Sequence, residues 1–111
     1  MIWVHYARGD GEHELTINGH AGYAEHGKDI VCAGVSAIAF ALLGWLENNE
    51  EELTQLDELM VDDGEVYIAC AGSDNVDVAF QVALIGLIQI SRQYPDHVTI
   101  KYSGTAGDSR E

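Results

Sequence analysis

The sequence predicts a single α+β domain in which one mostly antiparallel sheet packs against two apolar helices. The length of 111 residues suits one domain, and the 47% of apolar residues suffice for a hydrophobic core. Short stretches of alternating apolar and polar residues predict strands, and two long apolar stretches predict helices. They follow one another in the order ββα-ββα-β, which we assign to residues 1–102, with residues 103–111 as a flexible tail.

The first half of the chain is predicted to form a hairpin, a loop and a helix. Apolar and polar residues alternate over residues 2–8 and, after a turn at residues 9–11, again as far as Asn18, which is typical of a β-hairpin. Residues 19–29 contain three glycines and are expected to form a loop. The apolar stretch 30–49 is predicted to be a helix.

The second half is predicted to repeat this plan. A short strand over residues 56–61, a turn at residues 62–64 and a strand over residues 65–71 would form a second hairpin. A long apolar helix is expected over residues 76–94, followed by a last strand over residues 97–102.

Both predicted helices are apolar around most of their circumference, and residues 78–90 show this most clearly. One sheet covers only one side of a helix, so the opposite side needs another cover. In a chain of this size we expect a second copy of the same protein to provide it. The sequence therefore predicts a homodimer.

No targeting or membrane-spanning segment is predicted. Residues 1–6 lack the basic start and apolar stretch of a signal peptide. The uncharged run 30–46 has 17 residues. This reaches the lower limit of a membrane span, roughly 17–25 residues, but no Lys or Arg cluster sets an orientation, so we interpret it as a buried helix. With only two cysteines, Cys32 and Cys70, and no C-x-x-C pair, we expect free thiols and a cytoplasmic protein.

The net charge limits the kinds of partner. The chain has 19 Asp and Glu against 5 Lys and Arg, a formal charge of -14. Proteins that bind nucleic acid or anionic membranes rely on basic residues, so neither partner is expected. The charge is also uneven, because no Lys or Arg lies between Lys28 and Arg92, where 12 Asp and Glu occur. Such a surface serves solubility and also favours a basic partner.

The segment 19–36 contains the candidate chemistry. A histidine, His20, ends a predicted strand, and Cys32 follows the loop in the first turn of a predicted helix whose N-cap is Asp29. Backbone amides at a helix N-terminus lack intrahelical acceptors, and the helix dipole favours a thiolate. If the loop folds back, His20 could serve as base or ion-pair partner, with oxyanion donors from the helix amides.

Two neighbours of this pair have two interpretations each. The Asp29 carboxylate could cap the helix, or it could instead orient the imidazole of His20. Ser36 lies one helical turn beyond Cys32 and could hydrogen-bond the loop or only pack as a small residue. By spacing alone, a cysteine in an apolar helix is more often a packed core thiol than a nucleophile.

A zinc site built from His20, His26, Cys32 and Asp29 fits none of the usual ligand spacings, so no metal is expected. His26 lies in the loop and could touch a substrate. The other histidines, His5, His13 and His97, fall in predicted strands and are interpreted as surface or edge residues. Cys70 ends an apolar strand and is interpreted as buried and inert.

The pattern Gly-His-Ala, followed by Gly, Asp and Val-Cys-Ala-Gly-Val-Ser, resembles the ribosomal-processing cysteine protease family known as Prp. The resemblance covers nearly the whole chain. It implies a homodimeric endopeptidase without a cofactor, which removes the N-terminal extension of a large-subunit ribosomal protein, the one numbered twenty-seven. The alternative that we consider is a non-catalytic dimerising module that binds a basic ribosomal protein.

The resemblance also implies roles for single residues. The family's nucleophile falls on Cys32 and its catalytic histidine on His20, with supporting roles for Asp29, Ser36 and Gly19. The loop over residues 21–28, which lies between two glycine hinges, would be mobile and would become ordered when substrate binds. The residues assigned to this substrate loop are Ala21, Gly22, Tyr23, His26 and Gly27.

Overall fold

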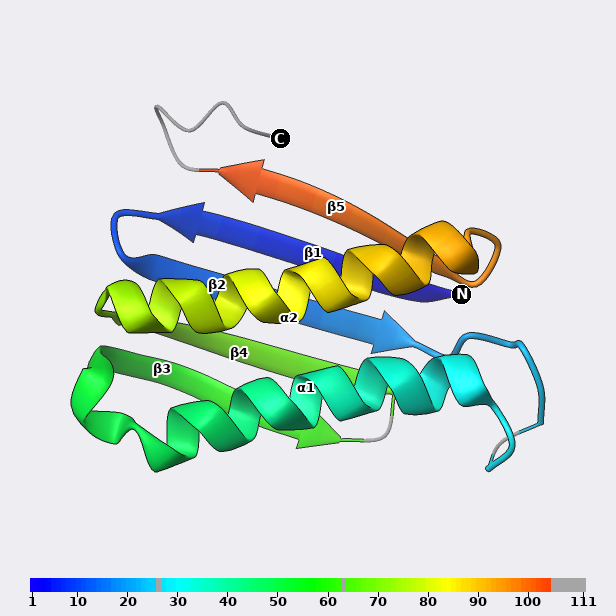
Figure 1. Cartoon of the computed structure of the whole chain (residues 1–111), viewed down its shortest axis with the longest axis horizontal. Coiled ribbons are helices and arrows are strands. Elements are labelled where there is room, and N and C mark those ends of the chain that lie inside the picture. Colours follow the sequence, from blue (N-terminus) through cyan, green and yellow to red (C-terminus); the bar gives the residue numbers. More distant parts are fainter. Residues whose placement is uncertain (26, 63, 105–111) are drawn as a thin grey trace.

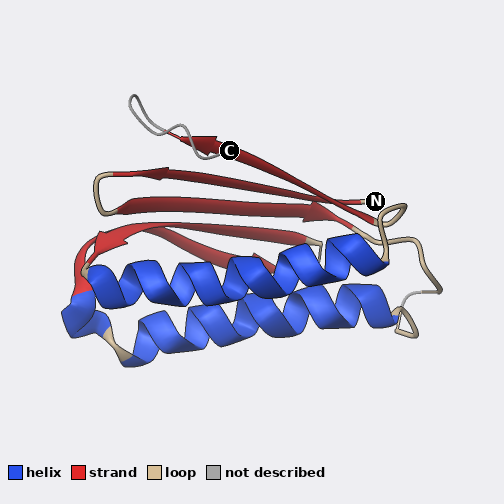
Figure 2. Cartoon of the chain, turned by 45° about the horizontal axis from the view of Figure 1, so that its top comes forward, coloured by secondary structure: helices blue, strands red, loops and turns tan. Residues whose placement is uncertain are grey.

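A computed structural model describes residues 1–25, 27–62 and 64–104, in which two helices cover one face of a five-stranded sheet (Figure 1). The elements in chain order are β1 (Ile2–Gly9), β2 (Glu12–Gly19), α1 (Ile30–Asn48), the 3-10 helix η1 (Glu50–Glu52), β3 (Leu53–Asp62), β4 (Glu65–Gly72), α2 (Asp74–Gln93) and β5 (Val98–Gly104). The two helices lie side by side on the same face of the sheet (Figure 2). The predicted fold class and the order ββα-ββα-β are confirmed, with η1 as an addition.

The strand order explains how the chain gathers distant segments at one end. The sheet runs β3-β4-β2-β1-β5, and β5 pairs with β1 in parallel while the other neighbours are antiparallel. Ile2 pairs with both Gly19 and Val98, and Asn18 pairs with Glu65. The starts of β1, β4 and β5 and the end of β2 therefore share one end of the sheet, where α1 also begins.

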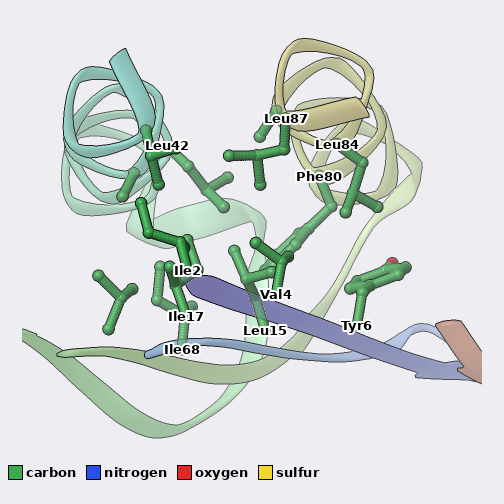
Figure 3. Packing of buried hydrophobic residues seen from close by; sticks show 14 of the residues in the cluster. Ile2, Val4, Tyr6, Leu15, Ile17, Leu42, Ile68, Phe80, Leu84 and Leu87 are labelled. Atoms are coloured by element: carbon green, nitrogen blue, oxygen red, sulfur yellow. The ribbon is translucent and has the colours of Figure 1, made fainter. Parts of the chain in front are cut away.

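The core lies between the sheet and the helices (Figure 3). Buried residues recur every three or four positions along each helix, so that each helix turns one stripe toward the sheet. These are Val31, Val35, Ala39, Leu42 and Leu46 in α1, and Val76, Phe80, Ala83, Leu84 and Leu87 in α2. Alternate strand residues meet them, among them Ile2, Val4, Leu15, Ile17 and Ile68. Each large side chain contributes about 1.5–3 kcal/mol when fully buried.

By length and composition alone, α1 could cross a membrane, and no other described helix meets those criteria. In the fold it lies along the sheet and contributes its buried stripe to the core (Figure 2). Much of its remaining surface is apolar and exposed, as at Phe40.

Three boundaries differ by two residues or more from those predicted. β3 begins at Leu53 rather than at residue 56, and two register shifts against β4 disturb the alternation that marks a strand. α2 begins at Asp74, because the hydroxyl of Ser73 accepts the N–H of Asn75 as an N-cap. β5 continues through Ser103 and Gly104, which had been assigned to the tail, because pairing with β1 extends that far. Residues 105–111 lie outside the described part.

The interpretation of His13 as a surface or edge residue is wrong. Its side chain is 3% exposed and stacks on Phe80 with 4.5 Å between ring centroids. The Nδ1 atom lies 2.6 Å from the hydroxyl of Tyr6. His13 shares the inner face of β2 with Leu15 and Ile17, as the alternation of strand residues requires.

Candidate active site

The end of the sheet where α1 begins contains the predicted chemical residues. His20 follows β2, and Cys32 lies in the first turn of α1. Both line two neighbouring cavities of about 390 and 580 Å³, and Ser36 also lines both. His20 and Ser36 are exposed and Cys32 is half-buried, so a ligand can reach all three.

The sulfur of Cys32, at the start of α1, receives a hydrogen bond from the backbone. Its Sγ accepts a hydrogen bond of 3.1 Å from the backbone N–H of Ala21. Cys32 is the third residue of α1 and therefore lies at the positive end of the helix dipole. Ala21, assigned by sequence to the substrate loop, is buried at 2% exposure, so the donor of this hydrogen bond is a core residue.

Asp29 caps α1 and also holds the preceding loop. One carboxylate oxygen accepts the N–H groups of Val31 and Cys32, both at 3.0 Å. The other accepts those of Tyr23 at 2.9 Å and Ala24 at 3.3 Å. Burial alone would raise the pKa of this carboxyl, but the four amides outweigh it and the pKa is lowered.

Of the two roles considered for Asp29, the structure therefore shows the cap. This cap also affects the helix amides, which the sequence predicts as oxyanion donors. The amides of Val31 and Cys32 already donate to Asp29, so the helix N-terminus acts on the site through its dipole rather than through these two groups.

The imidazole of His20 rests on Gly64, in the turn between β3 and β4. A Cβ atom at Gly64 would lie 2.7 Å from Nε2 of His20, and Gly64 has a φ of 71°. The backbone around His20 is held as well, since Gly19 donates its N–H to the carbonyl of Gly64 at 2.9 Å. The amine of Met1 donates to the carbonyl of His20 at 2.6 Å.

Sequence reasoning missed Gly64 as a site residue. The turn sequence Asp-Asp-Gly indicates a glycine with positive φ, but nothing in it names the side chain that would lie on top. Gly19 also has a positive φ, 99°, and lies against the backbone of Met1, which leaves no space for a side chain.

The loop after His20 is tied to the far edge of the sheet. The Tyr23 ring meets Tyr94 and His97 edge to face, with 5.4 Å between centroids in each pair. Nδ1 of His97 lies 2.8 Å from the carbonyl oxygen of Ala21. His97, interpreted from sequence as a surface or edge residue, is half-buried in the turn before β5 and contacts the loop at Ala21 and Tyr23.

Two further residues that the sequence assigns to the substrate loop line the larger of these two cavities. Gly22 and Gly27 are exposed and line the cavity of about 580 Å³, together with Ala24 and Asp29. His26 lies outside the described residues.

The smaller cavity joins apolar and acidic surfaces. Val35, Phe40 and Val61 supply apolar walls, while Asp62 and Glu65 bring carboxylates to the same space. A cavity of this kind suits an apolar side chain of a peptide that carries positive charge nearby.

The second cysteine differs from the first. Cys70 is 2% exposed, and burial raises the pKa of its thiol to about 11, with a further contribution from Asp57. Both cysteines are free thiols. A thiol that remains protonated is a poor nucleophile, so the buried Cys70 is poorly suited to catalysis. Cys32, by contrast, lines two cavities together with His20.

Within the described ranges, no group of three or more His, Cys, Asp and Glu residues lies close enough to hold a metal ion. Both oxygens of Asp29 are already engaged by backbone amides. Cys32 and His20 bring a thiol and an imidazole to the same two cavities, a pair of groups that can carry out acyl transfer.

Comparison with known proteins decides the family. Residues 1–99 match the family model described as Cysteine protease Prp. The chain belongs to the Prp family of cysteine proteases. Its enzyme class is therefore that of a cysteine-type endopeptidase.

Individual Prp proteins agree in sequence and in fold. The ribosomal processing cysteine protease Prp of Mycoplasma genitalium is 40% identical over 86 residues, which cover 78% of this chain and 84% of the relative. A crystal structure of Prp from S. aureus with a covalently linked product peptide has a TM-score of 0.80 at 28% identity, covering 93% of this chain and all of that one. A second S. aureus Prp structure, with a substrate peptide, has a TM-score of 0.69 at 25% identity over the same shares.

Proposed function

We propose that this Prp protein removes the N-terminal extension of the large-subunit ribosomal protein numbered twenty-seven, with Cys32 as nucleophile and His20 as base. The observation that carries the proposal is the sulfur of Cys32, which accepts the Ala21 N–H while it shares two cavities with His20. The relatives named as ribosomal processing proteases, one of them bound to a product peptide, support the reaction class.

In the proposed reaction, His20 takes the proton of the Cys32 thiol, and the thiolate attacks the carbonyl carbon of the scissile peptide bond. His20 then gives this proton to the leaving amine, and an acyl-enzyme thioester remains. Water, activated by His20, hydrolyses the thioester and restores the thiol. The dipole of α1 stabilises negative charge on the sulfur before the attack and on the carbonyl oxygen during it.

A basic protein is the kind of substrate that the charge favours. The chain carries a formal charge of -14, and Asp62 and Glu65 place carboxylates at the cavity beside Cys32. A ribosomal protein is basic, so opposite charge would speed its encounter with the enzyme. The same charge disfavours direct binding to nucleic acid or to an anionic membrane. The proposed location of the reaction is the cytoplasm, as the free cysteines suggest.

A homodimer is part of the proposal. Phe40 of α1 and Val78, Val82 and Ile85 of α2 are each more than half exposed. Val78 and Val82 also line an apolar groove of about 730 Å³ between the helices, together with Trp45. An apolar surface on this scale favours association, and a second copy would cover both helices at once.

Mass spectrometry of the full-length ribosomal protein after incubation with the enzyme tests the proposed reaction. We expect one cut near the N-terminus with the wild type and none with Cys32→Ala or His20→Ala. The rate should fall as salt is added, because salt screens opposite charges. A wild type that binds the protein but leaves it whole would indicate the non-catalytic binding module instead.

A further inference from the structure

His97 holds a fixed position beside the loop, because both of its backbone groups are engaged. Its N–H donates to the carbonyl of Tyr94 at 2.9 Å, and its carbonyl accepts the N–H of Ile2 at 2.8 Å. The first contact ties it to the end of α2 and the second to the start of β1. These two contacts fix the backbone from which the half-buried imidazole extends.

The imidazole meets the loop at Ala21, the residue that also contacts the nucleophile. Nδ1 of His97 lies 2.8 Å from the Ala21 carbonyl oxygen. A carbonyl oxygen only accepts hydrogen bonds, so Nδ1 carries the hydrogen. The N–H of Ala21 itself donates to Sγ of Cys32 at 3.1 Å. The carbonyl and the N–H of Ala21 belong to two consecutive peptide planes that meet at its Cα atom. A hydrogen bond to the carbonyl therefore holds Ala21 in place and limits the rotations about its φ and ψ that would turn its N–H away from the sulfur.

The Tyr23 ring strengthens this anchor. It packs edge to face against His97, with 5.4 Å between ring centroids. The loop is thus held on both sides of Gly22, by a hydrogen bond at Ala21 and by an aromatic contact at Tyr23.

We propose that His97 is a positioning residue for the nucleophile, acting through Ala21. Its hydrogen bond holds the Ala21 carbonyl and thereby directs the Ala21 N–H at the sulfur of Cys32, where it stabilises the thiolate. His97 transfers no proton in this role. The inference rests on the proposed role of Cys32 as the nucleophile and adds a residue 76 positions away from Ala21 in sequence.

A pair of substitutions at His97 separates the effect of its hydrogen bond from the effect of the packing of its ring. Asparagine and leucine have nearly the same size and shape, and only asparagine can place an N–H near the position of the imidazole Nδ1. We therefore compare His97→Asn with His97→Leu. Three properties are measured: the alkylation rate of Cys32 by iodoacetamide at neutral pH, thiolate absorbance at 240 nm relative to Cys32→Ser, and kcat and KM for peptide cleavage.

For His97→Leu we expect a fall of about three- to tenfold in the alkylation rate and in kcat, the size that follows from losing one hydrogen bond. The thiolate absorbance should fall as well, while KM changes less than twofold, because His97 does not line the described cavities. His97→Asn should retain rates within about twofold of the wild type. His5→Leu is the matched control, since His5 meets Ser103 instead of the loop.

Two results would overturn the inference. One is an unchanged alkylation rate in His97→Leu. The other is an equal loss in His97→Asn and His97→Leu, which would assign the effect to packing of the ring. If the leucine variant does not fold, His97→Asp replaces it, because an ionised carboxylate matches asparagine in size and cannot donate. If alkylation changes as expected but the wild type cuts no ribosomal protein, the substrate proposal fails and the role of His97 stands.

Discussion

The imidazole of His20 occupies the space that a side chain at position 64 would need. A Cβ atom at Gly64 would lie 2.7 Å from Nε2 of His20, closer than real Cβ atoms come to a neighbour, and 3.0 Å from Cε1. The turn between β3 and β4 thus serves as the platform on which His20 rests. This relationship links a hairpin far along the chain to the residue that we propose as the base.

Gly64→Ala should therefore affect catalysis more than stability. The φ of 71° makes any other residue cost about 1–2 kcal/mol of unfolding free energy, and the new methyl group displaces the imidazole as well. We expect kcat to fall by about ten- to a hundredfold. Peptide cleavage and chemical unfolding of the same samples provide the two measurements.

Gly11→Ala is the control for this prediction. Gly11 has a φ of 72°, and a Cβ atom there meets only the carbonyl oxygen of Gly72, at an ordinary 3.4 Å. It lies in the β1–β2 turn, at the other end of the sheet. The backbone penalty is the same, so stability should fall similarly while kcat stays unchanged. Equal kcat losses in both variants would contradict the proposed platform.

Asp29→Ala should destabilise the protein by about 1–2 kcal/mol, because the cap of α1 loses its acceptor. The folded pKa of Asp29 lies below the ordinary 3.8. Its carboxylate therefore contributes full stability above that value and loses it as pH falls through the folded pKa. The difference in unfolding free energy between Asp29→Asn and the wild type should then shrink from pH 7 to pH 3. Asp10→Asn, at an exposed turn, should show no such change.

The fold was predictable because its signals are periodic. Alternation marks the strands, and the apolar stretches mark the helices. The parallel pairing of β5 with β1 was not predictable, because it depends on α2 carrying the chain across two strands. The burial of His13 follows from the same periodicity, since its alternation with Leu15 and Ile17 places it on the inner face.

The site was predictable only where its residues lie close together in sequence. Cys32 and Asp29 belong to one helix start, and His20 precedes the same loop. Gly64 and His97 come from two other turns, which reach the site because the starts of β4 and β5 lie at its end of the sheet. No local pattern indicates a contact made by strand pairing.

The buried His13 should make the protein less stable in mild acid. Burial lowers the pKa of His13 below 6.5, although Asp77 opposes the shift, and Arg8 adds to it. The unfolded chain therefore binds a proton more readily than the folded one, so stability is full above pH 6.5 and declines as pH falls below it. Urea unfolding at pH 8 and pH 5.5 should show a smaller difference in His13→Gln than in the wild type. His5→Gln, at a partly exposed position, should behave like the wild type, and an identical difference in all three proteins would contradict the prediction.

The apolar helix face gives the last prediction. Val82 is 64% exposed on α2, and Val82→Glu would place a charge in the proposed dimer interface. Burying an unpaired carboxylate is costly, so the variant should be monomeric. Light scattering should give twice the chain mass of 12.1 kDa for the wild type and the single mass for the variant.

Trp3→Glu tests whether any exposed apolar residue would serve as well. Trp3 is 59% exposed and alternates with the buried Ile2 and Val4, so it lies on the face of the sheet away from the helices. This variant should remain dimeric, because neither helix is touched. A dimer that dissociates in Trp3→Glu and persists in Val82→Glu would move the interface to the open face of the sheet and leave the helices without a partner.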